Sequence, residues 1–391
     1  MRIGILSAAA KAYSTKRLKA AAKQRGHTVK VIDYLKYSIF MAENQSALFM
    51  EGKKAAKLDA VIPRIGASAT VFGSAVVRQF EQMGIYALNG SYAIGIARDK
   101  LRTIQVLGRH GIGIPPTACV HSKDSILPAV QMVGGDPVII KLLQGTQGVG
   151  VILAESTKSA EAIIETLQIA QQNVLIQKFV SESRGRDIRA FVVGDRVVAA
   201  MRRTAQGDEF RSNVHRGGLT EAVQLSKEYV ETAIRAAHII GLHVAGVDIL
   251  ESDEGPKVME VNASPGLEGI EEATGVDVAD AIIAYLEEQV LFPHFEISER
   301  LALSRDFAIY ELPITATSIL AKKTLEESAL AQKGIQVLCI IRKGNALSNP
   351  APSEKALPGD LLLCYGQKGS LKTLLPQRLK RLMKNETQNE A

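Results

Sequence analysis

Two carboxylates and an amide occupy positions from which they could meet across a pair of strands. Asp248 lies in one apolar run, Glu260 and Asn262 lie in the next, and the polar turn 252–255 separates the two runs. If the runs pair as a hairpin, Asp248 and Glu260 sit nearly opposite each other, and Glu260 and Asn262 share one face about 6.6 Å apart. Three oxygen donors on one face suit a hard cation such as Mg²⁺. Two such ions about 3.5–4 Å apart can clamp a transferring phosphoryl group.

The alternative interpretation of this pattern is a solvated sheet face, on which polar residues are common. Here the neighbours of Asp248 and Glu260 are Val, Ile, Leu and Met. Burying an unpaired charge is costly. We therefore expect a metal ion or a cationic partner beside these carboxylates.

A glycine-rich segment follows Lys141. Residues 144–150 include Gly145, Gln147 and Gly148. Glycines let the backbone approach an anion closely and aim N–H groups at it, and a lysine adds a point charge for phosphate. The sequence contains no GxxxxGK[ST] pattern, so a P-loop is excluded. An ordinary flexible hairpin explains the segment equally well, and both interpretations stay open.

Residues 210–218 concentrate cationic and amide side chains before a pair of glycines. Arg211 and Asn213 could hold a phosphate or a substrate carboxylate through several hydrogen bonds. A basic surface loop is the alternative, but it does not account for the adjacent glycines. We leave His215 outside the catalytic set, because a lone histidine is more often a structural hydrogen-bonding group.

The elements that must position these residues begin with an alternation of strand and helix patterns. Strand patterns occur at residues 2–6, 28–33, 59–62 and 86–88, and helical patterns occur at residues 15–25 and 72–83. This βαβ rhythm predicts a small parallel α/β domain with helices on both faces. No GxGxxG follows the first strand, so a dinucleotide site is not supported.

The remainder of the chain predicts an α+β unit and a smaller appended domain. A helical pattern at 99–111 leads into the breaker cluster 113–116, and strand patterns then dominate up to about residue 290. We therefore expect an N-terminal domain at 1–95, a catalytic domain at 96–290, a linker at 291–306, a small domain at 307–375 and a basic, then polar, tail at 376–391.

Composition narrows the class of protein. The 391 residues are 46% hydrophobic and 23% charged, which is typical of a globular protein, and no apolar run approaches the ~20 residues of a membrane span. The N-terminus lacks a signal-peptide pattern, and the three cysteines lie far apart, so we expect a cytoplasmic protein with reduced thiols. The net charge of +6 reflects either solubility or attraction to an anionic partner. With 5% aromatic residues, direct nucleic-acid recognition is not expected.

Taken together, these motifs resemble the ATP-grasp superfamily and, within it, the RimK family. The resemblance covers residues 1 to about 290 and rests on Asp248 with Glu260-x-Asn262, on Phe-Arg-Ser-Asn followed by His-Arg-Gly-Gly within 210–218, and on Asn-Ala-Ser-Pro-Gly at 262–266. RimK-type enzymes add glutamate residues to the C-terminus of a small-subunit ribosomal protein. The implied fold is an ATP-grasp fold, with a parallel α/β pre-ATP-grasp domain followed by central and C-terminal ATP-grasp subdomains.

The resemblance also implies roles for individual residues. The residues expected to contact the ATP phosphates are Lys100, Lys141, Arg211, Ser212 and Asn213, under a mobile lid at 144–150 that includes Gly145, Gln147 and Gly148. The hinge strand expected to read the adenine edge contains Gln177, Lys178 and Phe179, and Asp187 is expected along the nucleotide. The expected ligands of two Mg²⁺ ions, which Mn²⁺ could replace, are Asp248, Glu260 and Asn262.

The implied reaction joins a carboxylate to an amine at the expense of ATP. An acceptor carboxylate attacks the γ-phosphoryl group to give an acyl-phosphate, and the amine of L-glutamate or another amino acid then displaces phosphate. The expected acceptor is the C-terminal carboxylate of a ribosomal protein or peptide, and a homo-oligomer is expected by analogy. Two alternatives remain: a related ligase acting on a small carboxylate or a carrier protein, and a non-catalytic nucleotide sensor.

One position departs from more distant ATP-grasp ligases, which carry an arginine near the oxyanion two residues before the metal-binding aspartate. This chain has Gly246 there. Another cation must then act at the oxyanion, and Arg189, Arg203 and Arg211 all remain candidates.

Residues 307–375 resemble a TrkA-C domain, the small βα module of potassium-channel regulators. The resemblance rests on a helix expected to begin at 323–325, on the strand 337–342, and on Pro-Gly-Asp followed by an apolar strand at 358–366. It implies a small α/β domain that binds a ligand or mediates dimerisation, and a purely structural appendage is the alternative.

Overall fold

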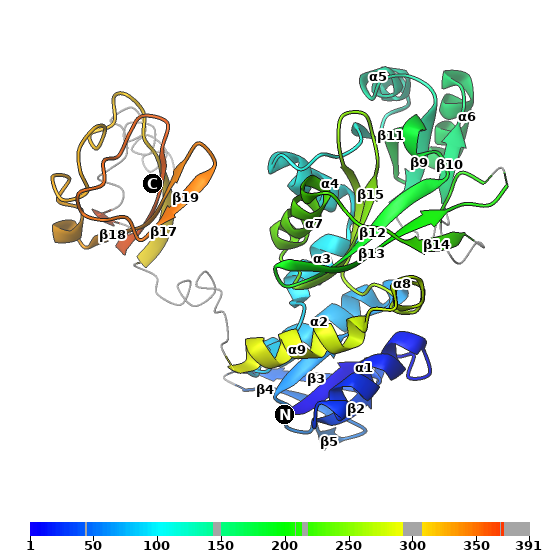
Figure 1. The fold of residues 1–391 in the computed structure, drawn as a ribbon, viewed down its shortest axis with the longest axis horizontal. Coiled ribbons are helices and arrows are strands. Elements are labelled where there is room, and N and C mark those ends of the chain that lie inside the picture. Colours follow the sequence, from blue (N-terminus) through cyan, green and yellow to red (C-terminus); the bar gives the residue numbers. More distant parts are fainter. Residues whose placement is uncertain are drawn as a thin grey trace. The chain divides into compact units, whose positions relative to one another are not determined.

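The computed structural model describes residues 1–43, 45–143, 150–207, 209–212, 218–291, 307–367 and 369–370. The chain divides into two compact units, Met1–Pro293 and His294–Ala391 (Figure 1). The predicted tail at 376–391 and nearly all of the predicted linker lie outside the described residues. Within the described residues, no helix is long and apolar enough to cross a membrane.

The first unit begins with the predicted parallel sheet. Its order is β2-β1-β6-β7, and the strands are β1 (Arg2–Leu6), β2 (Thr28–Ile32), β6 (Ala60–Pro63) and β7 (Tyr86–Ala87). Ile3 and Ile5 pack against α1 (Tyr13–Gln24) and α9 (Val278–Leu291), whereas Leu6 packs on the side of α2 (Thr70–Gln82). Because side chains alternate along a strand, one sheet buries both faces under helices.

A small antiparallel sheet was not predicted. It consists of β3 (Tyr37–Ala42), β4 (Gln45–Met50) and β5 (Lys53–Lys54), and it follows the 3-10 turn η1 (Tyr34–Lys36). Several of its side chains are exposed, including Phe40 and Met41. Tyr37, Ala47 and Leu48 are buried. Apolar residues thus occupy exposed as well as buried positions, and they do not alternate with polar ones in the way that would mark these segments as strands.

The central part of the first unit is an antiparallel sheet with helices on one face. Its order is β10-β9-β11-β8, and the strands are β8 (Thr117–Val120), β9 (Val138–Leu142), β10 (Val151–Ala154) and β11 (Val174–Lys178). The covering helices are α5 (Ile126–Met132) and α6 (Thr157–Ile169), above the sheet in Figure 1. Val138 and Ile140 belong to the core with these helices, so strand alternation leaves Ile139 and Lys141 on the opposite face.

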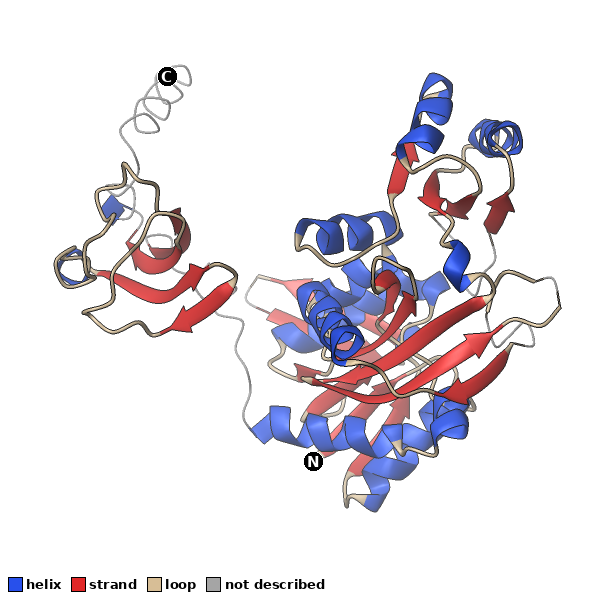
Figure 2. Ribbon diagram, turned by 45° about the horizontal axis from the view of Figure 1, so that its top comes forward, coloured by secondary structure: helices blue, strands red, loops and turns tan. Residues whose placement is uncertain are grey.

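A larger antiparallel sheet completes the first unit (Figure 2). Its order is β14-β13-β12-β15-β16, with β12 (Arg186–Val193), β13 (Arg196–Thr204), β14 (Leu219–Ala222), β15 (Val244–Leu250) and β16 (Lys257–Asn262). One face packs on α7 (Lys227–Ile240), and the other packs on α8 (Glu268–Thr274) and α9. Phe191 and Val193 belong to the core with α8 and α9. Asp187 and Arg189 lie on the same face of β12 nearer its N-terminal end, so this face changes from charged to apolar along the strand.

Two helices join the parallel sheet to the rest of the unit. They are α3 (Ser91–Arg98) and α4 (Lys100–Arg109), and Asp99 separates them. The Asp99 side chain accepts a hydrogen bond from the backbone N–H of Arg102 and so caps α4. The cap places Lys100 at the first position of α4.

The second unit is a four-stranded antiparallel sheet in the order β17-β20-β18-β19. Its strands are β17 (Phe307–Pro313), β18 (Ile335–Arg342), β19 (Asn345–Ser348) and β20 (Leu361–Gln367). The helix expected from residue 323 is wrong, because residues 325–330 form turns before the 3-10 turn η6 (Ala331–Lys333). The N–H of Leu325 donates to the carbonyl of Glu354. A backbone group that a helix would use internally is therefore bonded to a distant segment. The TrkA-C resemblance stays a prediction.

Candidate active site

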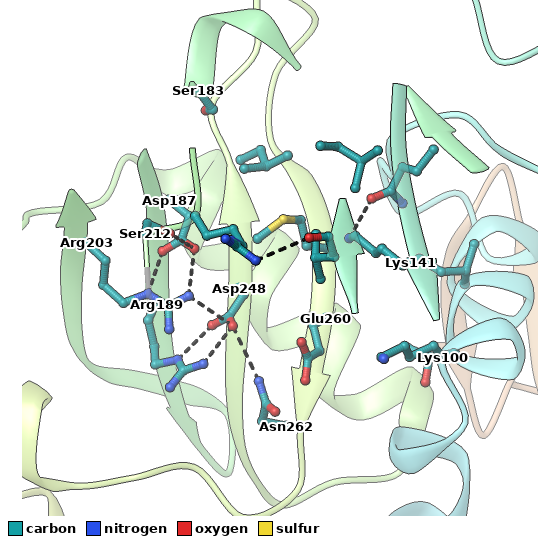
Figure 3. A pocket seen from close by; sticks show the side chains of 18 of the residues that line it. Lys100, Lys141, Ser183, Asp187, Arg189, Arg203, Ser212, Asp248, Glu260 and Asn262 are labelled. Carbon is teal, nitrogen blue, oxygen red and sulfur yellow. Dashed lines mark hydrogen bonds and ion pairs between the residues drawn. The ribbon is translucent and has the colours of Figure 1, made fainter. Parts of the chain in front are cut away.

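The carboxylates that opened the sequence analysis face each other across two strands. In the pairing of β15 with β16, Asp248 is the partner of Glu260, and Gly246 is the partner of Asn262. The hairpin prediction is therefore confirmed. Figure 3 shows Asp248, Glu260 and Asn262 close together at one side of a pocket.

This pocket is a cavity of about 450 Å³ in the first unit, with walls from the central sheet and from the five-stranded sheet. All the described residues of the predicted site line it: Lys100, Lys141, Gln177, Lys178, Phe179, Asp187, Arg189, Arg203, Arg211, Ser212, Asp248, Glu260 and Asn262. Four further predicted residues, Gly145, Gln147, Gly148 and Asn213, lie outside the described residues. The structure thus gathers side chains from distant parts of the chain around one space.

Two lysines form a cationic wall of the cavity. The Nζ of Lys141 donates to Oε1 of Gln177 at 2.7 Å, and the Nζ of Lys100 donates to the carbonyl of Leu142 at 2.8 Å. Burial lowers the pKa of Lys141 to about 8, and the charge of Lys100 acts in the same direction. Burial also lowers the pKa of Lys100. An anion between the two ammonium groups would relieve this cost.

An apolar slot adjoins the lysines. Its lining includes Ile139, Leu175 and Met259. Phe179 follows the end of β11, and within the described part of the chain its backbone N–H and C=O have no hydrogen-bond partner. A flat apolar space beside unpaired backbone groups suits a planar heterocycle that has its own donors and acceptors.

Four charged residues form a ladder across the five-stranded sheet, drawn with dashed lines in Figure 3. Arg189 donates to both carboxylate oxygens of Asp248, at 2.7 and 2.6 Å. Arg203 donates to both oxygens of Asp187, at 2.6 and 2.7 Å. The Nη2 of Arg203 also lies 3.0 Å from Oδ2 of Asp248. The hydroxyl of Ser212 also donates to Asp187, at 2.5 Å. Asp187 thus holds Arg203 and Ser212 in place, a role the sequence did not indicate.

The two facing carboxylates differ in their partners. Burial opposes the charged form of Asp248, but Arg189 and Arg203 outweigh it and hold the pKa of Asp248 below its usual value. Desolvation by the cavity walls and the charge of Asp248 raise the pKa of Glu260, although the side chain itself is exposed to the open cavity. Among the described residues, no hydrogen-bond donor reaches the carboxylate of Glu260. The expected cationic partner of Asp248 is therefore a pair of arginines, whereas Glu260 faces the cavity without one.

The donor set around Glu260 fits a magnesium ion. Asn262 turns its Nδ2 toward the Gly246 carbonyl at 3.4 Å and toward Asp248 at 3.5 Å, which leaves its amide oxygen available. Within the described residues, no group of three or more His, Cys, Asp or Glu could hold a metal ion. Two carboxylates and an amide suit Mg²⁺, which usually completes its shell with substrate phosphates and water.

Gly246 lies beside Arg189. A Cβ atom on Gly246 would lie 3.6 Å from Nε of Arg189, which is an ordinary contact, and 2.8 Å from Cβ of Pro265, which is too close. The absence of a side chain at Gly246 therefore makes room for Pro265, and Arg189 is the candidate cation next to this position.

All three candidate cations already have a carboxylate partner. Arg189 is held by Asp248, Arg203 is 3% exposed within the ladder, and Arg211 is held by Glu209 through two contacts of 2.8 Å. The nearness of Arg189 to Gly246 is what distinguishes it from the other two.

Two residues of the cavity were not singled out from the sequence. Arg98 and Ser264 line it beside the metal-ligand candidates. Arg98 immediately precedes Asp99 and Lys100, and Ser264 follows Asn262 by two positions. Ser264 belongs to the Asn-Ala-Ser-Pro-Gly motif at 262–266, but its place in that motif implied no role of its own, and for Arg98 the only signal was its closeness to Lys100.

Two protein-family models match the first unit. The model of the RimK PreATP-grasp domain matches residues 1–94, and the model of the RimK-like ATP-grasp domain matches residues 97–286. A protein of Rhodopirellula baltica described as a probable alpha-L-glutamate ligase is 55% identical over 97% of this chain and 94% of its own length. A probable alpha-L-glutamate ligase 1 of Hahella chejuensis is 54% identical over 74% of this chain and 95% of its own length.

Solved structures support the same fold at lower identity. The ATP-grasp ligase PsnB, complexed with a phosphomimetic variant of its minimal precursor, Mg and ADP, has a TM-score of 0.58 at 23% identity and covers 74% of this chain and 98% of its own. A RimK domain protein of Sphaerobacter thermophilus has a TM-score of 0.57 at 22% identity and covers 73% of this chain and 99% of its own. These likenesses concern the fold.

Proposed function

The chain belongs to the RimK-like ATP-grasp family of ATP-dependent ligases, and we propose that it adds glutamate to the C-terminus of a ribosomal protein or peptide. One observation carries the proposal: the lysine wall and the Asp248–Glu260–Asn262 set face each other across one cavity. A phosphoryl group between them would meet cations on one side and a metal site on the other.

Asp248, Glu260 and Asn262 would hold magnesium, and we propose two ions, which manganese could replace. Bound there, the metal would supply positive charge to the phosphate oxygens of the nucleotide. Arg189 and Arg203 keep Asp248 ionised before any metal arrives. Asp248 is thus already ionised and held by arginines, whereas the carboxylate of Glu260 has no hydrogen-bond donor among the described residues and is open to a metal ion.

In the first half-reaction, an oxygen of the acceptor carboxylate attacks the γ-phosphorus of ATP. The bond from that phosphorus to the β,γ-bridging oxygen breaks, and ADP leaves. Lys100 and Lys141 would hold the phosphates in line, with the adenine in the apolar slot next to Phe179. Ser212 and Arg211 line the same cavity. Positioning and charge stabilisation supply most of the catalysis in this kind of transfer.

In the second half-reaction, the glutamate amine attacks the carbonyl carbon of the acyl-phosphate. The carbon–oxygen bond to phosphate then breaks, and the nitrogen loses a proton as the amide forms. We propose that Arg189, which lies beside Gly246, stabilises the oxyanion of the tetrahedral intermediate. We also propose that residues 144–150 cover the site and exclude water.

The substrate assignment rests on the named relatives and on charge. Two relatives at 54–55% identity are described as probable alpha-L-glutamate ligases. Structural neighbours were solved with precursor, leader or core peptides, which supports a peptide as the acceptor. The net charge of +6 favours an acidic amino acid and an acidic product.

Phosphate release and mass spectrometry together test this function. The full chain would be incubated with ATP, Mg²⁺ and each common amino acid, with and without a ribosomal-protein C-terminal peptide that ends in glutamate. Stepwise mass gains of one glutamyl residue on the peptide are expected. A mass gain that corresponds to another amino acid would reject glutamate as the substrate. A mass gain on a small carboxylate in place of the peptide would favour the related ligase class. Tight ATP binding without phosphate release in any mixture would overturn the ligase.

A further inference from the structure

A second cationic group lies at the carboxyl edge of the N-terminal parallel sheet. Arg64 directly follows β6, and its backbone N–H donates to the carbonyl of Leu6 at the end of β1, at 2.9 Å. Arg98, at the end of α3, donates to the carbonyl of Ile65. Ligands of open α/β sheets bind outside this edge of the strands.

Neither arginine forms an ion pair with a carboxylate in the part of the chain that the structure describes. Among the described residues, no side-chain hydrogen bond or ion pair engages Arg64, and Nε of Arg98 is buried without a hydrogen-bond partner. Burial, aided by the charge of Arg98, lowers the pKa of Arg64 to about 10. Burial also lowers the pKa of Arg98, against the influence of Glu260 and Tyr34. Two guanidinium groups that repel each other in a partly enclosed space favour the binding of an anion.

Of the two arginines, Arg98 lines the active-site cavity, and Arg64 lies near it at the sheet edge. Arg98 and Ala67 line the cavity together with Glu260 and Ser264. The hydroxyl of Ser264 is buried without a hydrogen-bond partner among the described residues. Glu260 is the carboxylate that acts on Arg98, and it is also a proposed metal ligand, so its charge would be taken up when metal binds. An additional anion is then needed beside Arg98.

We propose that Arg64 and Arg98 form a subsite for a carboxylate of the glutamyl substrate, with the Ser264 hydroxyl as a further donor. This inference rests on the proposed function and deepens it. The carboxylate belongs either to the incoming glutamate or to the C-terminal residue of the acceptor, since both have the same chemistry. Held there, it would place the reacting amine or carboxylate on the side of the cavity formed by Glu260 and Asn262. A guanidinium fork matches a carboxylate in charge and geometry.

Steady-state kinetics of the full chain test the subsite. The variants are Arg64→Gln, Arg98→Gln and Arg64→Lys, and the matched control is Arg109→Gln, which changes an exposed arginine on α4. We expect Arg64→Gln and Arg98→Gln to raise the KM for glutamate or for the acceptor by about 10- to 100-fold, with the KM for ATP unchanged. Arg64→Lys should fall between these variants and the wild type, and the control should match the wild type.

The KM that rises identifies the source of the carboxylate. A rise for glutamate alone assigns the subsite to the incoming amino acid, and a rise for the peptide alone assigns it to the acceptor. Unchanged values for both substrates, or a rise for ATP alone, would overturn the subsite. The Arg64→Gln protein should not melt below the wild type, because the substitution removes one of two repelling charges.

A binding measurement separates this proposal from the proposed function. Calorimetry would follow glutamate, glutarate and glutamine binding to the full chain with Mg²⁺ and a non-hydrolysable ATP analogue. Glutamate and glutarate binding that is weakened in Arg64→Gln, in a protein that adds no amino acid, would keep the subsite and reject the ligase. If Arg64→Gln and Arg98→Gln both ligate glutamate with unchanged KM values, the ligase stands and the subsite is rejected. If the wild type neither binds these ligands nor ligates, both proposals fail.

Discussion

At the residue scale, two carboxylates that look equivalent in the sequence have different electrostatic surroundings. Asp248 is ionised and hydrogen-bonded by Arg189 and approached by Arg203, whereas Glu260 faces Lys100 and Lys141 across the cavity. Glu260 is therefore the carboxylate whose charge the bound ligands must neutralise. Substitutions at these positions should separate metal binding from nucleotide binding.

Glu260→Gln should abolish turnover. The amide retains the size of the side chain but removes the charge that metal and phosphates require, so kcat should fall by at least about 10²-fold. Phosphate release measures the effect. Glu254→Gln is the matched control, because Glu254 is exposed in the turn between β15 and β16 and pairs with Lys257 there. Full activity in Glu260→Gln would contradict the metal assignment.

Lys141 should make ATP binding sensitive to pH. Burial lowers the pKa of Lys141 from 10.5 to about 8, with Glu260, Asp248 and Asp187 opposing the shift and Lys100 adding to it. The ammonium group is therefore present below pH 8 and lost above it. The Kd for ATP, measured by calorimetry from pH 7 to 9.5, should rise above pH 8 by up to about tenfold per pH unit.

Lys141→Arg is the control for this pH dependence, because arginine stays charged throughout the range. Its Kd for ATP should vary less with pH than that of the wild type. An equally steep curve in Lys141→Arg would show that another group titrates.

At the element scale, strand register places the charged residues. Arg189 pairs with Asp248, and Asp187 pairs with Arg203, because β12 lies between β13 and β15 in the sheet. The face that these residues share is apolar further along, where Phe191 packs on α8 and α9. The core thus anchors the same strands that present the catalytic candidates, which is how a packed sheet can hold charged groups in fixed geometry.

Gly246→Ala should disturb this arrangement. The added Cβ would lie 2.8 Å from Cβ of Pro265, so the segment that carries Pro265 would have to shift beside Arg189. We expect a loss of about 1–3 kcal/mol in the free energy of unfolding, together with lower kcat. Gly95→Ala is the contrasting variant, because its Cβ meets nothing within 4 Å inside α3. It should raise stability by about 0.5–1 kcal/mol and leave kcat unchanged. Thermal denaturation measures both, and equal stability of the two variants would refute the crowding.

At the scale of the whole molecule, the second unit has its own core and sheet. The relative from Rhodopirellula baltica matches 97% of this chain and therefore extends into that unit. The match to the Hahella chejuensis protein spans 289 residues and nearly all of that relative. We therefore propose that the second unit is an addition to a self-sufficient ligase and that it binds a ligand or mediates homo-oligomer formation.

A protein truncated after Pro293 should keep ligase activity. Its kcat/KM for ATP should match that of the full chain within about twofold, since domains with separate cores fold independently. Light scattering on both proteins would show whether the second unit changes the oligomeric state. Loss of turnover in a truncated protein that is folded and binds ATP would place a catalytic contribution in the second unit.

The sequence by itself determined the local elements and the hairpin that carries Asp248 and Glu260. Strands and helices in the parallel domain follow from side-chain periodicity, and the opposition of Asp248 and Glu260 follows from a short turn between two apolar runs. The glycine-rich segment pointed to Lys141, and the family resemblance added Lys100. The meander formed by β3, β4 and β5 escaped prediction because its apolar residues occupy exposed as well as buried positions and so show no clear alternation.

Only the tertiary structure decided which charges neutralise one another. Arg189 and Asp248 are 59 residues apart, and Arg98 reaches the carbonyl of a residue 33 positions away. The sequence left three arginines open as the oxyanion partner, and the structure shows that Arg189 is the one that lies beside Gly246. Such pairings depend on which strands become neighbours in a sheet. That choice is made by the packing of the whole unit, and so the chemistry of the site could not be read from local pattern.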